Sequence, residues 1–425
     1  MKPSRTDRSR ARPRIDEIRS AAGDLFLAQG YAPTTMNDIA QSVGILPGSL
    51  YHHFASKEVV AVEILDLFNE ELRALSAQLR KSGHAALPPE SRLRELCTSV
   101  GELSLRHAAA VRLRAFDPPT SSSDRFREAI ALQPIGLRRL WRTAAEDLRK
   151  KTPDERLDVD LFVQTLQRIS ITFATTLPLP VDPTRSAKTL CDTMFYGLTQ
   201  NTPSDDELDG SAPLRAAKDA VAQWGDPPTD DDMKAHILSS ARNEFARRGF
   251  DATTSRDIVE ASGVRMGSIY RRVPSMEGMF DEIARNFAEH IDVAMRKALR
   301  TDPADTAATI DAMAYVTVEA KRRFPDETKM MSLAWNQAQS GQPRFMVEYR
   351  KQVSARMTLL KRVLGDAKKG GTLTSPHSPT SLAPHVRNIA WIRFGHPERI
   401  HARREHLFLR NHLLRGVVTR PGADD

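Results

Sequence analysis

The sequence predicts an all-α protein built from two tandem copies of one helical unit. Residues 18–58 align without a gap to residues 237–277 at an offset of 219, with fifteen identities in 41 positions. In both copies apolar residues recur at three- and four-residue spacing, the pattern of amphipathic helices. Glycine turns and proline-rich breaks separate these stretches. A repeat of this length predicts a duplication of a whole structural unit.

Length, charge and cysteine content narrow the class of protein. The chain has 425 residues, 40% hydrophobic and 27% charged, which is enough for several folded domains. Its net charge of +8 favours an anionic partner. The two cysteines, Cys97 and Cys191, have no metal-type spacing, which fits a reducing compartment. Because neither a secretory signal nor a long apolar run is evident, we expect a cytoplasmic protein without a membrane partner.

The first copy predicts a short helix between two glycines. Gly30 follows an amphipathic stretch that begins near Ile15, and it suits the left-handed conformation at a helix end. Thr35 is placed to cap the next helix, and Asp38 to return a hydrogen bond to the cap. The second copy repeats this pair as Thr254 and Asp257. Gly44 then ends the helix after about two turns.

A second short helix follows, starting near Pro47, where proline is tolerated because first-turn N–H groups need no partner in the helix. Gly48 would allow close approach of another helix, and Ser56 would cap a fourth helix. Two short helices joined by a tight glycine turn form a helix-turn-helix. The second helix of such a motif has the size to enter a DNA major groove.

These residues resemble the DNA-binding domain of the TetR family of bacterial transcriptional regulators. The segments that carry the resemblance are Gly30-Tyr31, Thr34-Thr35, Ile39-Ala40, Val43-Gly44, Gly48-Ser-Leu-Tyr51, Phe54 and Ser56-Lys57-Glu58. The resemblance implies an all-helical DNA-binding domain, followed by a helical domain that dimerises and often binds a small effector. It is direct for residues 14–64 and 233–283. Elsewhere it depends only on length and helical pattern.

The expected domain order follows from the repeat and from composition. An acidic, proline-containing separator divides the units, with nine acidic and two basic residues between Asn201 and Asp232. The expected segments are a basic arm (1–13), a first helix-turn-helix domain (14–64) and regulatory domain (65–200), the acidic linker (201–232), and a second helix-turn-helix domain (233–283) and regulatory domain (284–425). The arm would either follow DNA phosphates or remain a solvated tail.

The candidate DNA-binding residues lie on and beside the two short helices. They are Thr34, Thr35, Leu46, Gly48, Ser49, Tyr51, His52, His53 and Lys57 in the first copy, and Thr253, Thr254, Arg265, Gly267, Ser268, Tyr270, Arg271 and Arg272 in the second. Each tyrosine would either pack its ring and offer its hydroxyl to a phosphate, or serve the core alone.

The copies differ at the positions expected to read DNA. Family members carry Ser or Thr at the start of the recognition helix, whereas this chain has Leu46 and Arg265, so the side-chain cap is lost. The resemblance implies that Lys57 grips a phosphate, and the second copy has Met276 there. The second copy is therefore either a reader of different DNA or a domain kept for packing.

The regulatory domains offer candidate linings for an apolar effector site. These are Phe116, Trp141, Phe162 and Phe173 in the first unit, and Tyr315, Met330, Met331, Trp335 and Phe345 in the second. The alternative is an ordinary core, since aromatic and Met residues at helical spacing also fill cores. The arginine run Arg399, Arg403, Arg404, Arg410 and Arg415 reads as a solvated face.

The last two helices of each unit are expected at 161–173 and 187–198, and at 382–392 and 400–417. In the family such a pair forms a four-helix bundle with a partner, so an intrachain bundle would fit this chain. It would act as an intrachain pseudo-dimer or as a homodimer.

The expected function is a sequence-specific regulator of transcription, a repressor released by a small effector. One chain would read an asymmetric operator in double-stranded DNA. The alternative is a non-specific architectural DNA-binding protein, whose affinity would depend on salt but not on sequence. No catalytic constellation, cofactor motif or metal-ligand spacing is evident, so we expect no enzyme, no cofactor and no metal.

Overall fold

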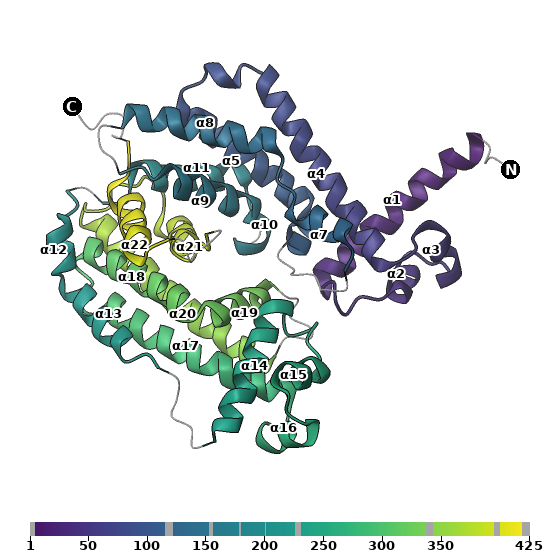
Figure 1. Cartoon of the computed structure of the whole chain (residues 1–425). Coiled ribbons are helices and arrows are strands. Elements are labelled where there is room, and N and C mark those ends of the chain that lie inside the picture. Colours follow the sequence, from purple (N-terminus) through teal and green to yellow (C-terminus); the bar gives the residue numbers. More distant parts are fainter. Residues whose placement is uncertain are drawn as a thin grey trace.

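The computed structural model describes residues 5–114, 122–152, 156–177, 180–199, 201–225, 231–336, 343–394 and 400–418. Over these residues the chain is helical without a named strand, apart from one isolated antiparallel β-bridge between Thr199 and Leu373. The all-α prediction is confirmed. Figure 1 shows the chain as two helical halves that meet along one side.

The first unit contains eleven α-helices within the described residues. They are α1 (Arg5–Ala28), α2 (Met36–Ser42), α3 (Pro47–His53), α4 (Lys57–Lys81), α5 (Pro89–Arg106), α6 (Ala108–Arg114), α7 (Asp124–Ala131), α8 (Ile135–Lys151), α9 (Val159–Ile171), α10 (Phe173–Thr176) and α11 (Pro183–Tyr196). The stretch expected as a basic arm belongs to α1 from Arg5 onward.

Two short helices, α12 (Asp205–Asp209) and α13 (Ala212–Ala222), lead into the second unit. That unit contains α14 (Asp232–Arg248), α15 (Ser255–Ser262), α16 (Met266–Arg272), α17 (Met276–Arg300), α18 (Thr306–Arg323), α19 (Pro325–Asn336), α20 (Arg344–Lys369), α21 (Pro379–Ala390) and α22 (Ala402–Arg410). A π-helical turn, Asn411–Arg415, continues α22.

The duplication extends through the whole fold. Shifting α11 by the sequence offset of 219 gives residues 402–415, the range of α22 and its π-helical turn together. The long helices α4 and α17 bury equivalent side chains at four-residue spacing: Val60, Ile64, Phe68 and Leu72 against Met279, Ile283, Phe287 and Ile291. The two units therefore share one architecture, including the regulatory domains, whose sequences no longer match clearly.

The units meet where two equivalent glycines cross. Gly197 and Gly416 follow α11 and the π-helical turn, and their numbers differ by the repeat offset of 219. The Leu198 N–H donates to the Leu414 carbonyl at 3.1 Å, and the Val417 N–H donates to the Phe195 carbonyl at 2.6 Å. Leu198 is equivalent to Val417, and Phe195 to Leu414. The contact is therefore reciprocal, as in an isologous dimer.

Only glycine fits at this crossing. Both residues have a positive φ (63° and 72°) with an extended ψ, a backbone region essentially limited to glycine. A Cβ on Gly197 would lie 2.2 Å from the Leu414 carbonyl oxygen, and one on Gly416 would lie 2.3 Å from the Tyr196 carbonyl carbon. The backbones approach each other as closely as main-chain hydrogen bonds allow.

The acidic linker and the arginine run bind each other. Arg410 is fully buried and donates to Asp205, Asp209 and Asp311 at 2.9, 2.6 and 2.8 Å. Burial alone would raise the pKa of Asp311, but hydrogen bonds from His406 and Arg410 lower it below the ordinary value. This network attaches α12 to the second unit, and α13 packs on α17 and α18.

The expectation of a solvated arginine face is wrong for the buried Arg410 and the largely buried Arg415, whereas Arg403 and Arg404 are exposed as expected, although each is paired. Arg403 pairs with Asp209, Arg404 with Asp158, and Arg415 with Asp205. Arg399 lies outside the described residues. The pair between Arg404 and Asp158 joins the two units, so charges that looked exposed in sequence contribute to the contact between the halves.

We predict that Gly197→Ala lowers the free energy of unfolding by roughly 3 kcal/mol or more, because strain at φ adds to overlap with the opposite backbone. Gly83 provides a matched control, since it has φ 77° and no atom within 4 Å of an added Cβ. Gly83→Ala should cost only about 1–2 kcal/mol. Urea unfolding of both variants measures the difference, and equal losses would contradict the role given to the crossing.

Candidate nucleic-acid interface

The first helix-turn-helix consists of α2 and α3. Thr35 caps α2 by accepting from the Asp38 N–H at 3.1 Å, and Asp38 accepts from the Thr35 N–H at 2.8 Å, so the predicted capping box is confirmed. These hydrogen bonds lower the pKa of Asp38. Gly44 makes the turn with φ 66°, and α3 begins at Pro47 as predicted.

The second helix-turn-helix, α15 and α16, repeats this construction. Thr254 and Asp257 form the same capping box, and Gly263 makes the turn with φ 67°. Neither recognition helix has a side-chain cap, since Leu46 and Arg265 stand at the capping positions without a capping hydrogen bond. The expected loss of that cap in both copies is confirmed.

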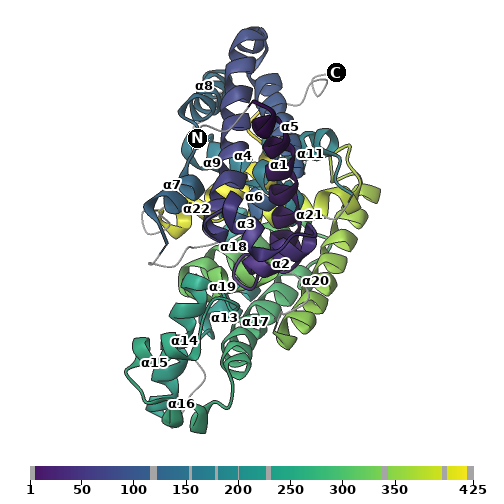
Figure 2. The ribbon, with the colours of Figure 1, turned by 90° about the vertical axis from the view of Figure 1, so that its right-hand side faces the viewer.

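Both recognition helices present most of their side chains to solvent. On each helix one residue is buried, Leu50 on α3 and Ile269 on α16. Leu46, Tyr51 and Met266 are 76%, 53% and 40% exposed, although large apolar side chains are usually covered. Figures 1 and 2 show α3 and α16 at the periphery of their units. These surfaces are free to contact another molecule.

The two exposed faces differ in charge. On α3 the exposed end carries His52 and His53. On α16, Arg265 and Arg271 are exposed, and neither forms a hydrogen bond or ion pair with any described residue. Arg272 is already engaged, because its Nε donates to Asp231 at 2.8 Å. The second helix therefore offers two free guanidinium groups, which suit guanine edges or phosphates.

Gly48 and Gly267 lie on the open face of their helices. A Cβ added at either residue would meet no atom within 4 Å. The expectation that Gly48 allows close helix packing is wrong in this structure. A small residue on an exposed recognition helix instead leaves room for another backbone to approach.

Two threonines from the candidate set serve the interior. Thr34 is fully buried and its hydroxyl donates to the Gly30 carbonyl at 2.6 Å. Thr253 is 8% exposed and makes the equivalent bond to Gly249 at 2.7 Å. Both fix the turn before the helix-turn-helix, so they are removed from the candidate DNA surface, whereas the capping residues Thr35 and Thr254 are exposed.

Lys57 is engaged inside its own domain. Its Nζ donates to the carbonyls of Tyr31 and Ala32 at 2.7 and 3.0 Å and lies 4.4 Å from the centre of the Tyr31 ring. Burial lowers the pKa of Lys57, while the charge of Asp38 opposes that shift. The ammonium group of Lys57 thus stabilises the turn after α1. In the second copy the equivalent residue is the apolar Met276.

The two tyrosines are not equivalent. Tyr51 is 53% exposed, and its hydroxyl has no hydrogen-bond partner among the described residues. The hydroxyl of Tyr270 is hydrogen-bonded to Ser255. The first copy has the buried Met36 at the position of Ser255, so it cannot make this bond. Tyr51 remains available to a phosphate, and Tyr270 is partly committed to its own domain.

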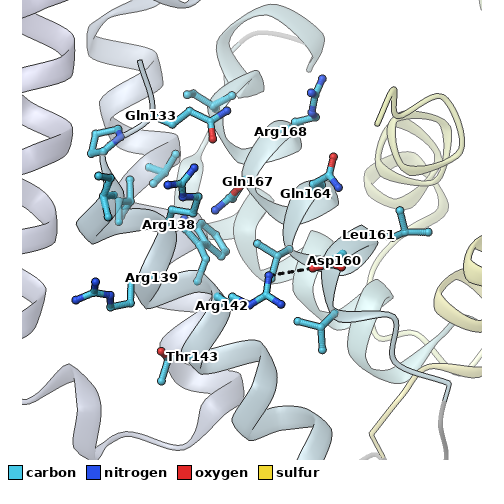
Figure 3. Close-up of a pocket in the computed structure, with 18 of the residues that line it drawn as sticks. Gln133, Arg138, Arg139, Arg142, Thr143, Asp160, Leu161, Gln164, Gln167 and Arg168 are labelled. Atoms are coloured by element: carbon cyan, nitrogen blue, oxygen red, sulfur yellow. Dashed lines mark hydrogen bonds and ion pairs between the residues drawn. The ribbon is translucent and has the colours of Figure 1, made fainter. Parts of the chain in front are cut away.

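The regulatory half of the first unit contains a cavity of about 930 Å³. Figure 3 shows Arg138 and Arg142 of α8 on the side toward Gln164 and Gln167 of α9, whereas Arg139 extends away from α9. Arg142 pairs with Asp160 at 3.0 Å. Ligand pockets commonly enclose 300–1,000 Å³, so the cavity has room for a small organic molecule.

A second cavity of about 590 Å³ lies between the two units. Of the residues expected to line an effector site, Trp141 lines the first cavity, and Met331 and Trp335 line the second. Phe162, Phe173, Tyr315, Met330 and Phe345 line neither and pack in the core. Phe116 lies outside the described residues. The arginines that line both cavities were missed because no local motif marks them.

The described residues include no group of three or more His, Cys, Asp or Glu side chains placed to hold a metal ion. In the same part of the chain, no helix combines the length and apolar character that crossing a membrane requires.

Comparison with protein families identifies the two domains. Residues 18–64 and 237–283 each match the model described as "Bacterial regulatory proteins, tetR family". These segments include both capping boxes and both recognition helices.

Similar curated proteins include HTH-type transcriptional repressor KstR2 of Rhodococcus jostii, 36% identical over 99 residues, which are 22% of this chain and 48% of that protein. KstR2 of Mycobacterium tuberculosis is 40% identical over 98 residues, 23% of this chain and 48% of that protein. HTH-type transcriptional regulator TcmR of Streptomyces glaucescens is 39% identical over 85 residues, 20% and 37% of the two chains. The chain thus spans about half the length, or less, of these relatives.

Among solved structures, the ketosteroid transcriptional regulator KstR2 of Mycobacterium tuberculosis aligns with 22% identity and a TM-score of 0.40, over 45% of this chain and 97% of that one. A probable transcriptional regulatory protein, RHA5900, aligns with 25% identity and a TM-score of 0.38, over 44% and 100%.

We predict that Thr34→Val lowers the free energy of unfolding by about 1 kcal/mol, because the Gly30 carbonyl loses its buried donor. The folded variant should bind DNA as tightly as the parent. Thermal unfolding and a DNA-binding titration, run below the melting transition, test both parts. A stability unchanged by the substitution, together with weakened DNA binding, would mean that Thr34 contacts DNA.

Proposed function

Because this chain carries two tandem DNA-binding domains of the TetR family, we propose that it is a transcriptional repressor that reads two unlike half-sites with one polypeptide. The protein would have no catalytic activity and would act in the cytoplasm, where the DNA is. A small effector, bound in the regulatory half, would release it.

The reciprocal contact at Gly197 and Gly416 is the observation that carries this proposal. A two-fold interface normally pairs equivalent residues of two subunits, and here equivalent residues of one chain are paired. Across the units, α21 packs on α9 and α11, and the π-helical turn that continues α22 packs on α11. A single chain would therefore act as its own dimer.

The unlike exposed faces of α3 and α16 support an asymmetric operator. Dimeric helix-turn-helix proteins match their own symmetry to that of the DNA site. In this chain the supporting residues are repeated, whereas His52 is replaced by Arg271 at the exposed end of the helix. A histidine and an arginine present different donors to base edges, so the two half-sites should differ in sequence.

Similarity to named repressors adds further support. The KstR2 proteins that match this chain are named transcriptional repressors, and the match reaches about half of their length. Repression by this chain is therefore inferred from its DNA-binding domains, while the choice of operator depends on residues that differ between its own two copies.

We predict that DNA selected from a random pool by the full chain contains two different half-sites. Arg271→Ala should weaken binding by about 1–3 kcal/mol and relax base preference in one half only. His52→Ala should relax the other half. Arg300→Ala is a matched control, because Arg300 is an exposed arginine of the second unit at the far end of α17.

Two results would overturn the proposal. A perfectly palindromic selected site would mean that one kind of domain, supplied by two chains, reads both halves. Equal affinity for selected and random DNA at physiological salt would instead identify a non-specific architectural protein.

A further inference from the structure

The cavity between the units has an apolar wall contributed mainly by the second unit. Phe287, Met295, Met331, Trp335, Met357 and Leu360 line it, and α6 and α9 of the first unit close it with Val111, Ile169 and Ile171. Met and aromatic side chains adapt to the shape of an organic ligand. Because both units contribute, a molecule bound here would touch both halves of the chain.

The polar part of the same cavity has an unusual charge balance. Five arginines line it (Arg114, Arg168, Arg356, Arg387 and Arg393), and none of the described residues that line it is acidic. Only Arg356 has a carboxylate partner, Asp292, at 3.1 Å. Arg114 binds Asn69 and the Leu132 carbonyl, and Arg387 lies against the Trp335 ring and the Asn388 amide.

Arg168 and Arg393 are the least compensated of these arginines. Neither guanidinium group makes a hydrogen bond or ion pair with any residue in the described ranges, although Asp326 attracts Arg393 from a greater distance. Arg168 is exposed toward the cavities, yet the surrounding protein lowers its pKa by desolvation. Desolvation and the charge of Arg168 both lower the pKa of Arg393.

Two like charges from different units thus line one cavity whose described lining contains no acidic residue. Charges that the protein partly shields from water are normally paired, because desolvation without a partner is destabilising. A bound anion would compensate both. Arginine is suited to this task, since its planar group binds a carboxylate through two parallel hydrogen bonds.

The cavity continues toward the one shown in Figure 3. Arg114, Gln133, Arg168 and Ile171 line both, so Arg168 stands at the junction of an apolar lobe and a polar lobe. In the polar lobe, Gln164 and Gln167 lie on the same helix as Arg168 (Figure 3). A ligand that reaches the junction would place its charged group between these amides and the apolar wall.

We propose that the cavity between the units binds an amphipathic carboxylate, with its apolar body against the Met-rich wall and its carboxylate on Arg168 and Arg393. This inference depends on the proposed function only where it makes the ligand an effector. Because the two arginines come from different units, the ligand would favour one relative position of the units. If the relative positions of the units differ in their affinity for the operator, the ligand would change how tightly the chain binds its operator.

Binding can be measured on the full chain without DNA. Trp335 and Trp391 line the cavity, so their fluorescence should change when dodecanoate is titrated below its micelle concentration. The neutral 1-dodecanol has the same chain without the charge, and it should bind roughly tenfold more weakly or worse. Equal binding of the two probes, or no binding of dodecanoate, would overturn the proposal.

Two variants locate the charged group. Arg168→Gln and Arg393→Gln should each weaken dodecanoate binding roughly tenfold while leaving dodecanol binding unchanged. Arg73→Gln, an exposed arginine of α4 outside both cavities, is the matched control. Dodecanoate affinity equal to that of the control would place the anion elsewhere. If a variant does not fold, the difference in affinity between dodecanoate and 1-dodecanol on the parent chain still tests whether the cavity prefers a carboxylate.

Operator binding in the absence of ligand keeps the two proposals separate. A chain that reads its operator but ignores dodecanoate would retain the proposed function and lose this site. A chain that binds dodecanoate with the expected charge preference but selects no DNA would retain this site and lose the proposed function.

Discussion

The crossing of Gly197 and Gly416 is the constraint on which the rest of this structure depends. At this point the two halves exchange main-chain hydrogen bonds, and neither backbone leaves room for a side chain. The pair of Arg404 with Asp158 adds a second contact between the units among the described residues. Because equivalent residues are paired reciprocally there, the crossing has the local form of an isologous dimer contact.

A covalent pair of units removes a restriction that a homodimer must obey. In a homodimer both recognition helices have one sequence, so each substitution changes both half-sites together. In this chain the buried residues and capping boxes are repeated, whereas the exposed faces have diverged, with His52 on one side and Arg271 at the equivalent position on the other. For the same reason, the two units can contribute different side chains to the cavity between them.

Local features of the fold could be predicted from the sequence, and distant pairings could not. The capping boxes, the start of α3 at Pro47 and the caps at Ser56 and Ser275 depend on neighbouring residues, and the structure contains them. Arg410 looked solvated because its partners, Asp205 and Asp311, are about a hundred residues or more away in sequence. Gly197 and Gly416 did carry a signal, since their spacing equals the repeat offset.

The candidate site shows the same division. Exposure of α3 and α16 follows from their short apolar faces, but the burial of Thr34 and the use of Lys57 by two carbonyls depend on how a turn folds back. We expect one chain to supply both recognition helices that bind an operator. Native mass spectrometry of the full chain on its selected operator measures this directly. One chain per duplex is the predicted result, and two chains per duplex, with no singly occupied complex, would contradict it.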